Sequence, residues 1–347
     1  MKQEIIQRIQ SVIENQPADA QEILSELKEI LNAATSPTPI GKESKEISEL
    51  VSTFLPLLKE GTHPRALIKT GFTNFDNEFG GFALGEFIIV GARPSMGKTQ
   101  LLINLSLHIS KTIPVLYFTF DLPEFLLTSR FISTISGVGI SSILQHNLTE
   151  EESRKLDSVQ QQLSRHKIFL NESCSNSMTV LRAICQQQIQ DNGVKVVIVD
   201  YLQMINLNAS RNSRELEVSR ISNELKSIAQ EFNVCVIASS QLSRSVEYRK
   251  EARYPQLSDL RESGSIEQNA DKVLFIYRPE YYDIRADHDG NNLAGFTQII
   301  VAKNRTGSLG NIKLLRDAEF TTFRDFDEYY NKIRFCNNRL DEIDIPF

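Results

Sequence analysis

One ten-residue stretch, Val90-Gly91-Ala92-Arg93-Pro94-Ser95-Met96-Gly97-Lys98-Thr99, restricts the fold of this chain more than any other. An apolar run precedes it at 87–90, and a helical pattern follows from Leu101. A strand, a small-residue loop ending in Gly-Lys-Thr, and a helix form the arrangement that grips nucleotide phosphates, because the backbone N–H groups and dipole at the helix start favour an anion. Lys98 adds a positive charge, and Thr99 is expected to place its hydroxyl on Mg²⁺. The alternative is an ordinary tight turn between a strand and a helix that carries a lysine.

This loop departs from the G-x-x-x-x-G-K-[ST] pattern at one position, where Ala92 replaces the first glycine and Gly91 lies one residue earlier. Because alanine is the smallest substitute for glycine, we expect the phosphate cradle to form. The residues predicted to bind the nucleotide here are Ala92, Arg93, Ser95, Met96, Gly97, Lys98, Thr99 and Gln100.

Length and composition limit the class of protein. With 347 residues and 41% hydrophobic content, the chain suits one large domain plus an appendage. The net charge of −6 gives no global basic field for nucleic acid, although a ring that threads a strand needs positive groups only in its channel. The four cysteines show no metal-binding spacing, which favours a reducing compartment. Without a signal peptide or a long apolar run, we expect a cytoplasmic protein with no membrane segment.

The chain divides by pattern into five segments. We predict a short helical hairpin at 1–33, a linker at 34–44, a helix at 45–60, an α/β domain at 61–330 and a tail at 331–347. The spacing of apolar residues in the helix at 45–60 is equally compatible with docking on its own domain and on a neighbouring subunit.

Strands and helices alternate through most of the large domain, which predicts right-handed crossovers and a mostly parallel sheet. The last two strands follow one another across the turn at 306–308 and are expected to be antiparallel. The predicted strands lie at 87–90, 114–120, 168–170, 195–199, 234–239, 273–277, 298–302 and 311–315. The predicted helices lie at 98–111, 123–136, 150–164, 179–192 and 214–232.

A second chemical signal is a carboxylate at the end of a buried strand. The apolar run at 196–199 ends in Asp200. Ligands of such sheets lie beyond the carboxyl ends of the strands, so Asp200 is expected beside the phosphate loop, where it would hold Mg²⁺ through water. The alternative is that Asp200 belongs to an ordinary turn, because aspartate is common where a strand ends in a turn.

Residues 45–325 resemble the linker helix and RecA-type C-terminal domain of DnaB-type replicative DNA helicases. The resemblance covers about four-fifths of the chain and does not cover residues 1–40, where the family has a larger helical module that forms a collar and binds primase. The motifs that carry it are Gly91-Ala92-Arg93-Pro94-Ser95-Met96-Gly97-Lys98-Thr99, Val199-Asp200-Tyr201-Leu202-Gln203, Ser240-Gln241-Leu242-Ser243-Arg244-Ser245-Val246-Glu247, Ser258-Asp259-Leu260-Arg261-Glu262-Ser263-Gly264-Ser265-Ile266-Glu267-Gln268 and Ala302-Lys303-Asn304-Arg305-Thr306-Gly307.

The resemblance implies a RecA-like P-loop NTPase core that uses ATP and Mg²⁺ and works as a ring, expected to be hexameric. In the family one subunit supplies the phosphate cradle and its neighbour supplies cationic groups. Lys303 and Arg305 match that pair, Gln241 matches a polar sensor of the γ-phosphate, and Arg130 matches an arginine that stacks on the base. Each of these residues also has a purely structural interpretation. Lys303 and Arg305 would then be solvated charges on an edge strand, Gln241 a loop or helix-capping residue, and Arg130 an exposed charge on a helix.

The chain departs from the family pattern at Asp121, where the family has a glutamate that positions the attacking water. Aspartate is one methylene shorter, which withdraws the carboxylate by about 1.5 Å, the length of a C–C bond. A positioning error of that size can lower the rate about a hundredfold. Glu124 is the nearest substitute in the sequence.

Contact with DNA is expected through Arg261, Glu262 and Gly264. In the family these positions touch the sugar-phosphate backbone of single-stranded DNA, and contacts of this kind carry no base specificity. The alternative is a polar surface loop that caps a helix.

The sequence therefore predicts an ATP-driven, ring-forming DNA helicase that translocates on single-stranded DNA, 5′ to 3′ by resemblance, with primase or a helicase loader as further partners. One alternative is a DnaB-like scaffold with a weakened ATPase in a phage, plasmid or defence system, which the short N-terminal segment and Asp121 favour. A recombinase-type ATPase of the same fold matches the motifs less closely.

Overall fold

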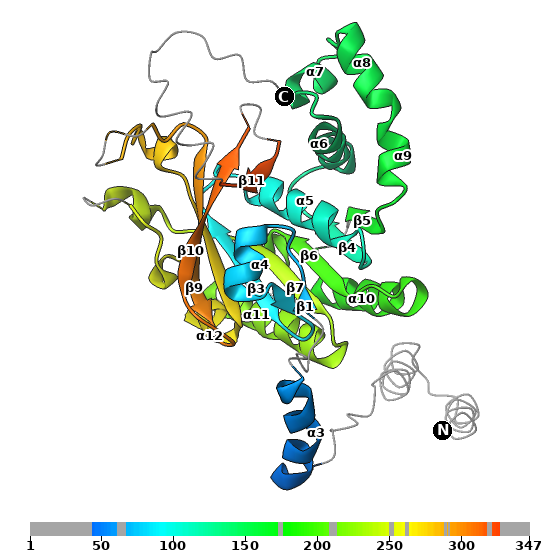
Figure 1. Cartoon of the computed structure of the whole chain (residues 1–347), viewed down its shortest axis with the longest axis vertical. Coiled ribbons are helices and arrows are strands. Elements are labelled where there is room, and N and C mark those ends of the chain that lie inside the picture. The colour runs from blue at the N-terminus through cyan, green and yellow to red at the C-terminus, as the bar shows by residue number, and fades with distance from the viewer. Residues whose placement is uncertain are drawn as a thin grey trace, which may run out of the picture. The chain divides into compact units, whose positions relative to one another are not determined.

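The computed structural model of the chain describes residues 44–60, 67–172, 176–207, 214–249, 253–260, 264–287, 290, 292–317 and 321–326 (Figure 1). The chain divides into two compact units, Met1–Pro64 and Arg65–Phe347, each of which is treated by itself. The hairpin predicted at 1–33, most of the linker predicted at 34–44 and the tail predicted at 331–347 lie outside the described residues.

In the first unit, the helix predicted at 45–60 is present as α3 (Ile47–Lys59). Its apolar side chains recur at helical spacing, and no residue of α3 is buried. An amphipathic helix gains most of its stability by packing its apolar face on another surface. The exposed apolar residues of α3 are Ile47, Val51, Phe54, Leu55 and Leu58.

The second unit is built on a nine-stranded sheet with the order β11-β10-β9-β8-β3-β7-β6-β4-β5 (Figure 1). The six strands from β8 to β5 pair in parallel, and β9, β10 and β11 add an antiparallel edge. The strands are β3 (Phe87–Ala92), β4 (Val115–Thr119), β5 (Ile168–Glu172), β6 (Val196–Asp200), β7 (Cys235–Gln241), β8 (Lys272–Tyr277), β9 (Phe296–Asn304), β10 (Gly310–Arg316) and β11 (Phe323–Asp325).

Helices cover both faces of the parallel part. The chain moves outward from β3 through β4 to β5 and then returns through β6 to β7, so right-handed crossovers place the outward and the returning helices on opposite faces. The outward helices are α5 (Lys98–Ile109), α6 (Glu124–Ser136), α7 (Ile140–Leu144), α8 (Glu150–Asp157) and α9 (Val159–Leu163), and the returning ones are α10 (Met178–Asn192) and α11 (Arg214–Glu231).

The core lies between these layers. Every residue of β3, β4, β6 and β8 is buried, as expected for parallel strands covered on both faces, which read as continuous apolar runs in the sequence. The predicted α/β fold with a mostly parallel sheet is therefore confirmed. The helix predicted at 150–164 is divided at Ser158 into α8 and α9.

Several short elements were not predicted, because they are too brief to show a hydrophobic period. They include the two-stranded sheet of β1 (Leu67–Ile68) and β2 (Phe82–Ala83), which flanks α4 (Thr73–Phe79). They also include α12 (Gly264–Asn269) and the short 3₁₀ helices η1 (Leu202–Met204), η2 (Arg244–Tyr248), η3 (Leu257–Asp259) and η4 (Pro279–Tyr282). Among the described residues, no helix combines the length and apolarity needed to cross a membrane.

Candidate active site

The register of the parallel strands gathers the predicted site residues at one edge of the sheet. Ala92, the last residue of β3, lies opposite Gln241 at the end of β7. Thr119, the last residue of β4, lies opposite Asp200 at the end of β6. Asp121 follows Thr119 by two residues. The ends of the four strands β3, β7, β6 and β4 therefore bring polar side chains to the carboxyl edge, where ligands of such sheets bind.

A cavity of about 550 Å³ opens at this edge. Nine of the predicted site residues line it: Ser95, Gly97, Lys98, Thr99, Gln100, Asp121, Arg130, Asp200 and Gln241. Pro94, Leu122 and Tyr201 complete the lining. The cavity therefore combines a phosphate-loop lysine and threonine, two carboxylates, two amides and an arginine.

The loop between β3 and α5 has the backbone that the phosphate cradle requires. Gly97 caps α5 with φ of 99°, a left-handed conformation that glycine adopts without steric cost. Ser95 also has positive φ, at 61°. Arg278, which follows β8, donates a hydrogen bond from its guanidinium to the Ser95 carbonyl oxygen at 3.0 Å, so the tip of the loop is tied to a neighbouring strand.

Lys98 is held inside the cradle by the loop itself. Its Nζ donates to the carbonyl oxygens of Ala92 at 3.1 Å and Arg93 at 3.3 Å. Burial lowers the pKa of Lys98 from its ordinary 10.5 to about 8, although the Asp200 charge opposes the shift. A desolvated ammonium group beside a loop of backbone N–H groups is suited to bind a negatively charged phosphate.

Three residues of the predicted cradle have side chains that do not line the cavity, namely Ala92, Arg93 and Met96. Ala92 and Met96 are buried in the core. The Arg93 guanidinium points to η2, where it donates to Glu247 Oε1 at 2.7 Å and to the Leu242 carbonyl oxygen at 2.8 Å. The structure thus gives the Arg93 side chain a role in fixing the loop and does not place it in the lining of the cavity.

Gln100 lies on the first turn of α5 and contacts the cavity, but its amide is engaged elsewhere. Its Nε2 donates to Thr134 Oγ1 on α6 at 2.9 Å and also to the Thr321 carbonyl oxygen. Gln100 therefore fixes α5 against α6 and the segment that precedes β11.

Asp200 is buried and both of its carboxylate oxygens accept hydrogen bonds. Tyr117 donates its phenol hydrogen to Oδ2 at 3.0 Å, and Ser239 donates its hydroxyl hydrogen to Oδ1 at 2.6 Å. A carboxylate fixed in this way, with Thr99 on the same cavity, fits a Mg²⁺ ion that keeps water ligands and also binds phosphate.

Gln241 is placed by a second glutamine. Gln203 on η1 accepts a hydrogen bond from the Gln241 backbone N–H at 3.3 Å and donates to Ser240 Oγ at 2.8 Å. The amide of Gln203 thus joins the end of β7 to the segment after β6, which is where a sensor of the γ-phosphate would need support.

Asp121 and Arg130 both line the cavity, from the β4–α6 loop and from α6. The Asp121 side chain is exposed. Glu124, the nearest substitute for it in the sequence, is exposed and not part of the lining. Asp121 is therefore the acidic residue of this loop that faces the cavity.

Lys303 and Arg305 lie at the opposite edge of the sheet. Because β9 is antiparallel to β8, Lys303 pairs with Val273 at the amino end of β8, beside the amino end of β3. The five steps between the six residues of β3, at about 3.3 Å each, separate this edge from the cavity of the same chain by roughly 17 Å. The pair does not reach its own chain's cavity.

Of the residues predicted to contact DNA, Arg261 and Glu262 lie outside the described residues. Gly264 is the first residue of α12 and is exposed. A Cβ added at Gly264 would meet no described atom within 4 Å, so a ligand could approach its backbone closely.

A family model described as the DnaB-like helicase C terminal domain matches residues 68–325. The chain belongs to this family. Among solved structures, it is similar to one described as an ATPase domain, with 30% identity and a TM-score of 0.75 over 82% of this chain and 100% of the other. A DnaB-like replicative helicase studied for its interactions with primase gives a TM-score of 0.78 at 30% identity, over 94% of this chain and 76% of the other. The RecA-like fold that the motifs predicted is thereby confirmed.

The chain is also similar to replicative DNA helicases of bacteria. The chain is 37% identical over 282 residues to the replicative DNA helicase DnaC of Bacillus subtilis, and 38% identical over the same length to DnaB of Geobacillus stearothermophilus. Each match covers 80% of this chain and 59% of the relative. The chain thus spans about three-fifths of the length of these relatives.

Four residues of this DnaB-like site were given no role by sequence reasoning. Tyr201 lines the cavity directly after Asp200, and that adjacency was the available signal. The other three act through hydrogen bonds to residues that are distant in the chain. Tyr117 is 83 positions from its partner Asp200, Ser239 is 39 positions from Asp200, and Gln203 is 37 positions from Ser240. A single sequence carries no signal for such pairings.

Proposed function

We propose that this chain is the motor domain of an ATP-dependent DNA helicase that assembles as a ring, translocates on single-stranded DNA and unwinds duplex DNA during replication. The observation that carries the proposal is the division of the ATPase machinery between two edges of the sheet. The cradle, Asp121 and Asp200 lie at the carboxyl edge, and the cations Lys303 and Arg305 lie at the amino edge. A second copy of the chain would supply what one copy lacks.

The residues of one chain divide the work of phosphoryl transfer. Lys98 and the loop N–H groups would bind the β- and γ-phosphates, and Arg130 would stack on the base. Asp121 would orient the attacking water and accept its proton, and Gln241 would contact the γ-phosphate. Thr99 and Asp200 would hold Mg²⁺, which would neutralise part of the phosphate charge.

The neighbouring copy would contribute Lys303 and Arg305 to the γ-phosphate. Positive groups placed where charge develops in the transition state are worth about 10³–10⁵ in rate for phosphoryl transfer. Hydrolysis would therefore depend on contact between subunits, which couples turnover to assembly of the ring. We place six copies in that ring by likeness to the family.

DNA would pass through the ring and contact Arg261, Glu262 and Gly264. Contacts to the sugar-phosphate backbone hold the strand without reading its sequence, which a translocating motor requires. The exposed apolar stripe of α3 supports docking of this helix on a neighbouring subunit. By likeness to a DnaB-like helicase described with primase, we propose primase or a helicase loader as further partners.

The test is ATP hydrolysis with and without single-stranded DNA, followed by unwinding of a forked duplex. Native chain should show stimulated turnover that Lys98→Ala abolishes. Mixing Lys98→Ala with Arg305→Ala chains should restore part of the turnover, because an intact cradle then meets an intact arginine across the interface. If neither variant alone nor the mixture differs from native chain, the proposal is wrong.

The alternative predicted from the sequence, a DnaB-like scaffold with a weakened ATPase, rests on the shorter side chain of Asp121, and the similarity to replicative DNA helicases does not favour it. In that case native chain would bind nucleotide and DNA but would hydrolyse ATP negligibly, with or without single-stranded DNA.

A further inference from the structure

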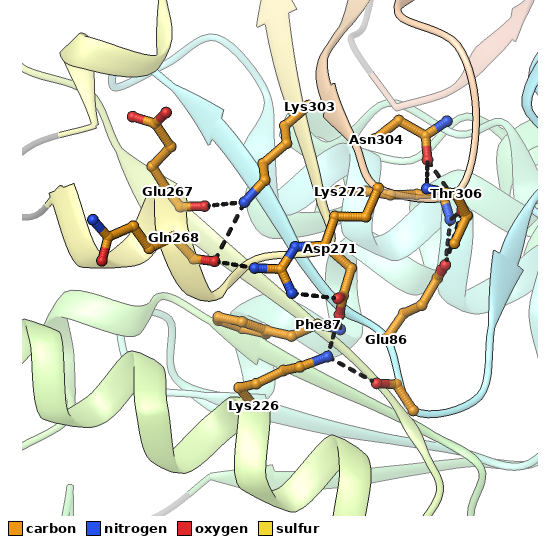
Figure 2. Close-up of polar contacts among 12 residues, drawn as sticks. Glu86, Phe87, Lys226, Glu267, Gln268, Asp271, Lys272, Lys303, Asn304 and Thr306 are labelled. Carbon is orange, nitrogen blue, oxygen red and sulfur yellow. Dashed lines mark hydrogen bonds and ion pairs between the residues drawn. The ribbon is translucent and has the colours of Figure 1, made fainter. Parts of the chain in front are cut away.

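Lys303 and Arg305 are both held by the carboxyl end of α12. Figure 2 shows Lys303 beside Glu267 and Gln268. Lys303 Nζ donates to the carbonyl oxygens of Glu267 at 2.5 Å and Gln268 at 3.3 Å. Arg305 donates from its second terminal nitrogen to the same Gln268 carbonyl oxygen at 2.5 Å. The last carbonyls of a helix lack partners within the helix, and cations are favoured there.

Arg305 has a further partner of opposite charge in Asp271. The guanidinium lies 3.4 Å from Asp271 Oδ1, and the Arg305 backbone N–H donates to the Asp271 carbonyl oxygen at 2.9 Å. The Arg305 side chain is 49% exposed, whereas that of Asp271 is 12% exposed. The arginine thus extends from a buried anchor toward the surface.

Asp271 is itself fixed to the core of the sheet. Its Oδ2 accepts a hydrogen bond from the backbone N–H of Phe87, the first residue of β3, at 2.7 Å. Lys226 on α11 donates to the same oxygen at 2.5 Å. These two donors occupy Oδ2 and leave Oδ1 turned to Arg305, so the direction of the carboxylate is set by a strand and a helix together (Figure 2).

The contacts of Arg305 leave the guanidinium able to take a second anion. A guanidinium carries five N–H donors, and here one terminal nitrogen meets Asp271 while the other meets Gln268. A long side chain with many rotamers loses less freedom on binding a phosphate if a fixed partner already selects its direction.

We propose that Asp271 is a positioning residue for Arg305, directing the guanidinium outward toward the nucleotide bound by a neighbouring copy of the chain. The inference rests on the proposed function, in which Arg305 acts across a subunit interface. Asp271 touches neither the nucleotide nor the reacting atoms, and its effect passes through Arg305.

The experiment compares stimulated ATP turnover of full-length chains carrying Asp271→Asn, Arg305→Ala or both. Asparagine keeps an oxygen for the Phe87 N–H but removes the charge that attracts Arg305. We expect Asp271→Asn to lower kcat about tenfold with KM within about twofold of native, because only transition-state contacts weaken. The double variant should match Arg305→Ala within about twofold, since residues acting as a unit are not additive.

Arg182→Gln is the matched control, because it removes ion pairs with Glu224 and Glu231 on α11 that do not involve Asp271. We expect it to change thermal stability but to leave kcat within about twofold of native. Asp271→Asn chains mixed with Lys98→Ala chains should regain turnover, because the second chain presents an intact Asp271–Arg305 pair to an intact cradle. A folding defect would not be rescued in this way.

The outcomes test the role of Asp271 separately from the proposed function. If Arg305→Ala lowers turnover but Asp271→Asn does not, or if the two losses multiply in the double variant, the inference is overturned and the proposed function stands. If Arg305→Ala leaves turnover unchanged, both are overturned.

Discussion

The phenol oxygen of Tyr117 lies 3.0 Å from Oδ2 of Asp200 and donates a hydrogen bond to it. Burial, and then the charge of Asp200, raise the pKa of Tyr117 well above its ordinary value of 10. The phenol therefore keeps its proton at any working pH and acts as a fixed donor. Together with Ser239 on the other oxygen, it holds the carboxylate that is proposed to support Mg²⁺.

Replacing Tyr117 with phenylalanine should loosen Asp200 without removing it. We expect about a tenfold loss of stimulated turnover and a Mg²⁺ midpoint shifted to higher concentration, since a partner of a metal-binding group typically changes metal affinity by about 10–100-fold. Turnover measured across a Mg²⁺ titration gives both values. Ser239→Ala, which removes the donor to the other oxygen, should act in the same direction, and native values in both variants would contradict the assigned role.

Nucleotide affinity should weaken above pH 8. The pKa of Lys98 is about 8 in the free protein, so the ammonium that binds phosphate is progressively lost as the pH rises through that value. Above this pH, Lys98 must take up a proton before it can bind phosphate as an ammonium. This requirement weakens nucleotide affinity by up to about tenfold, or about 1.4 kcal/mol, per pH unit. Titration with a non-hydrolysable ATP analogue from about pH 7 to about pH 9.5 measures this slope. Lys98→Arg, whose charge persists throughout, should give a flat curve over that range.

The length of the side chain at Asp121 should control turnover. Restoring one methylene with Asp121→Glu should raise stimulated turnover, because a displacement of about 1 Å in the site can cost about a hundredfold. Asp121→Asn should lower it by about 10²–10⁴, the typical contribution of a general base. Glu124→Gln is the matched control, since Glu124 is outside the cavity lining and should leave turnover unchanged. Equal rates for aspartate and glutamate would show that the backbone already compensates for the shorter side chain.

The parallel sheet could be predicted because its signals are local. Each buried strand is a continuous apolar run, and the helices between them are long enough to show a period. The division of one predicted helix at Ser158 could not be predicted, since a single residue between α8 and α9 leaves the period almost intact. The antiparallel strand β11 was missed because three residues carry no pattern.

The candidate site was predictable only where its residues lie in motifs. Lys98, Thr99 and Asp200 follow strands, and the parallel register brings them together. The side-chain direction of Arg93 was not predictable, because its partner Glu247 is 154 positions away. The anchoring of Arg305 on Asp271 likewise depends on contacts between elements that are distant in the chain.

Gly91 illustrates the same limit. In the sequence it lies one residue before the position where the phosphate-loop pattern has its first glycine, but in the structure it lies inside β3 against a core aromatic ring. A Cβ at Gly91 would come within 2.8 Å of Phe275 and 3.1 Å of Leu242. We expect Gly91→Ala to destabilise the fold by about 1–3 kcal/mol through overpacking. Ala92→Gly introduces no clash and should cost less, about 0.5–1 kcal/mol, and urea unfolding of the two variants checks the contrast.

The buried ion pair of Lys272 and Glu86 should matter to stability far more than exposed pairs of the same type. Lys272 Nζ lies 2.5 Å from Glu86 Oε1, and both side chains are almost completely buried. Lys272→Met would leave the Glu86 charge buried without its partner, which typically costs about 3–5 kcal/mol. Adding Glu86→Gln should recover much of that loss, because glutamine can still accept from the Ala83 N–H and leaves no lone charge. Urea unfolding measures each free energy, with Arg154→Ala, which breaks an exposed pair on α8, as the control expected to change nothing measurable. A single variant as stable as the native chain would show that water reaches this carboxylate.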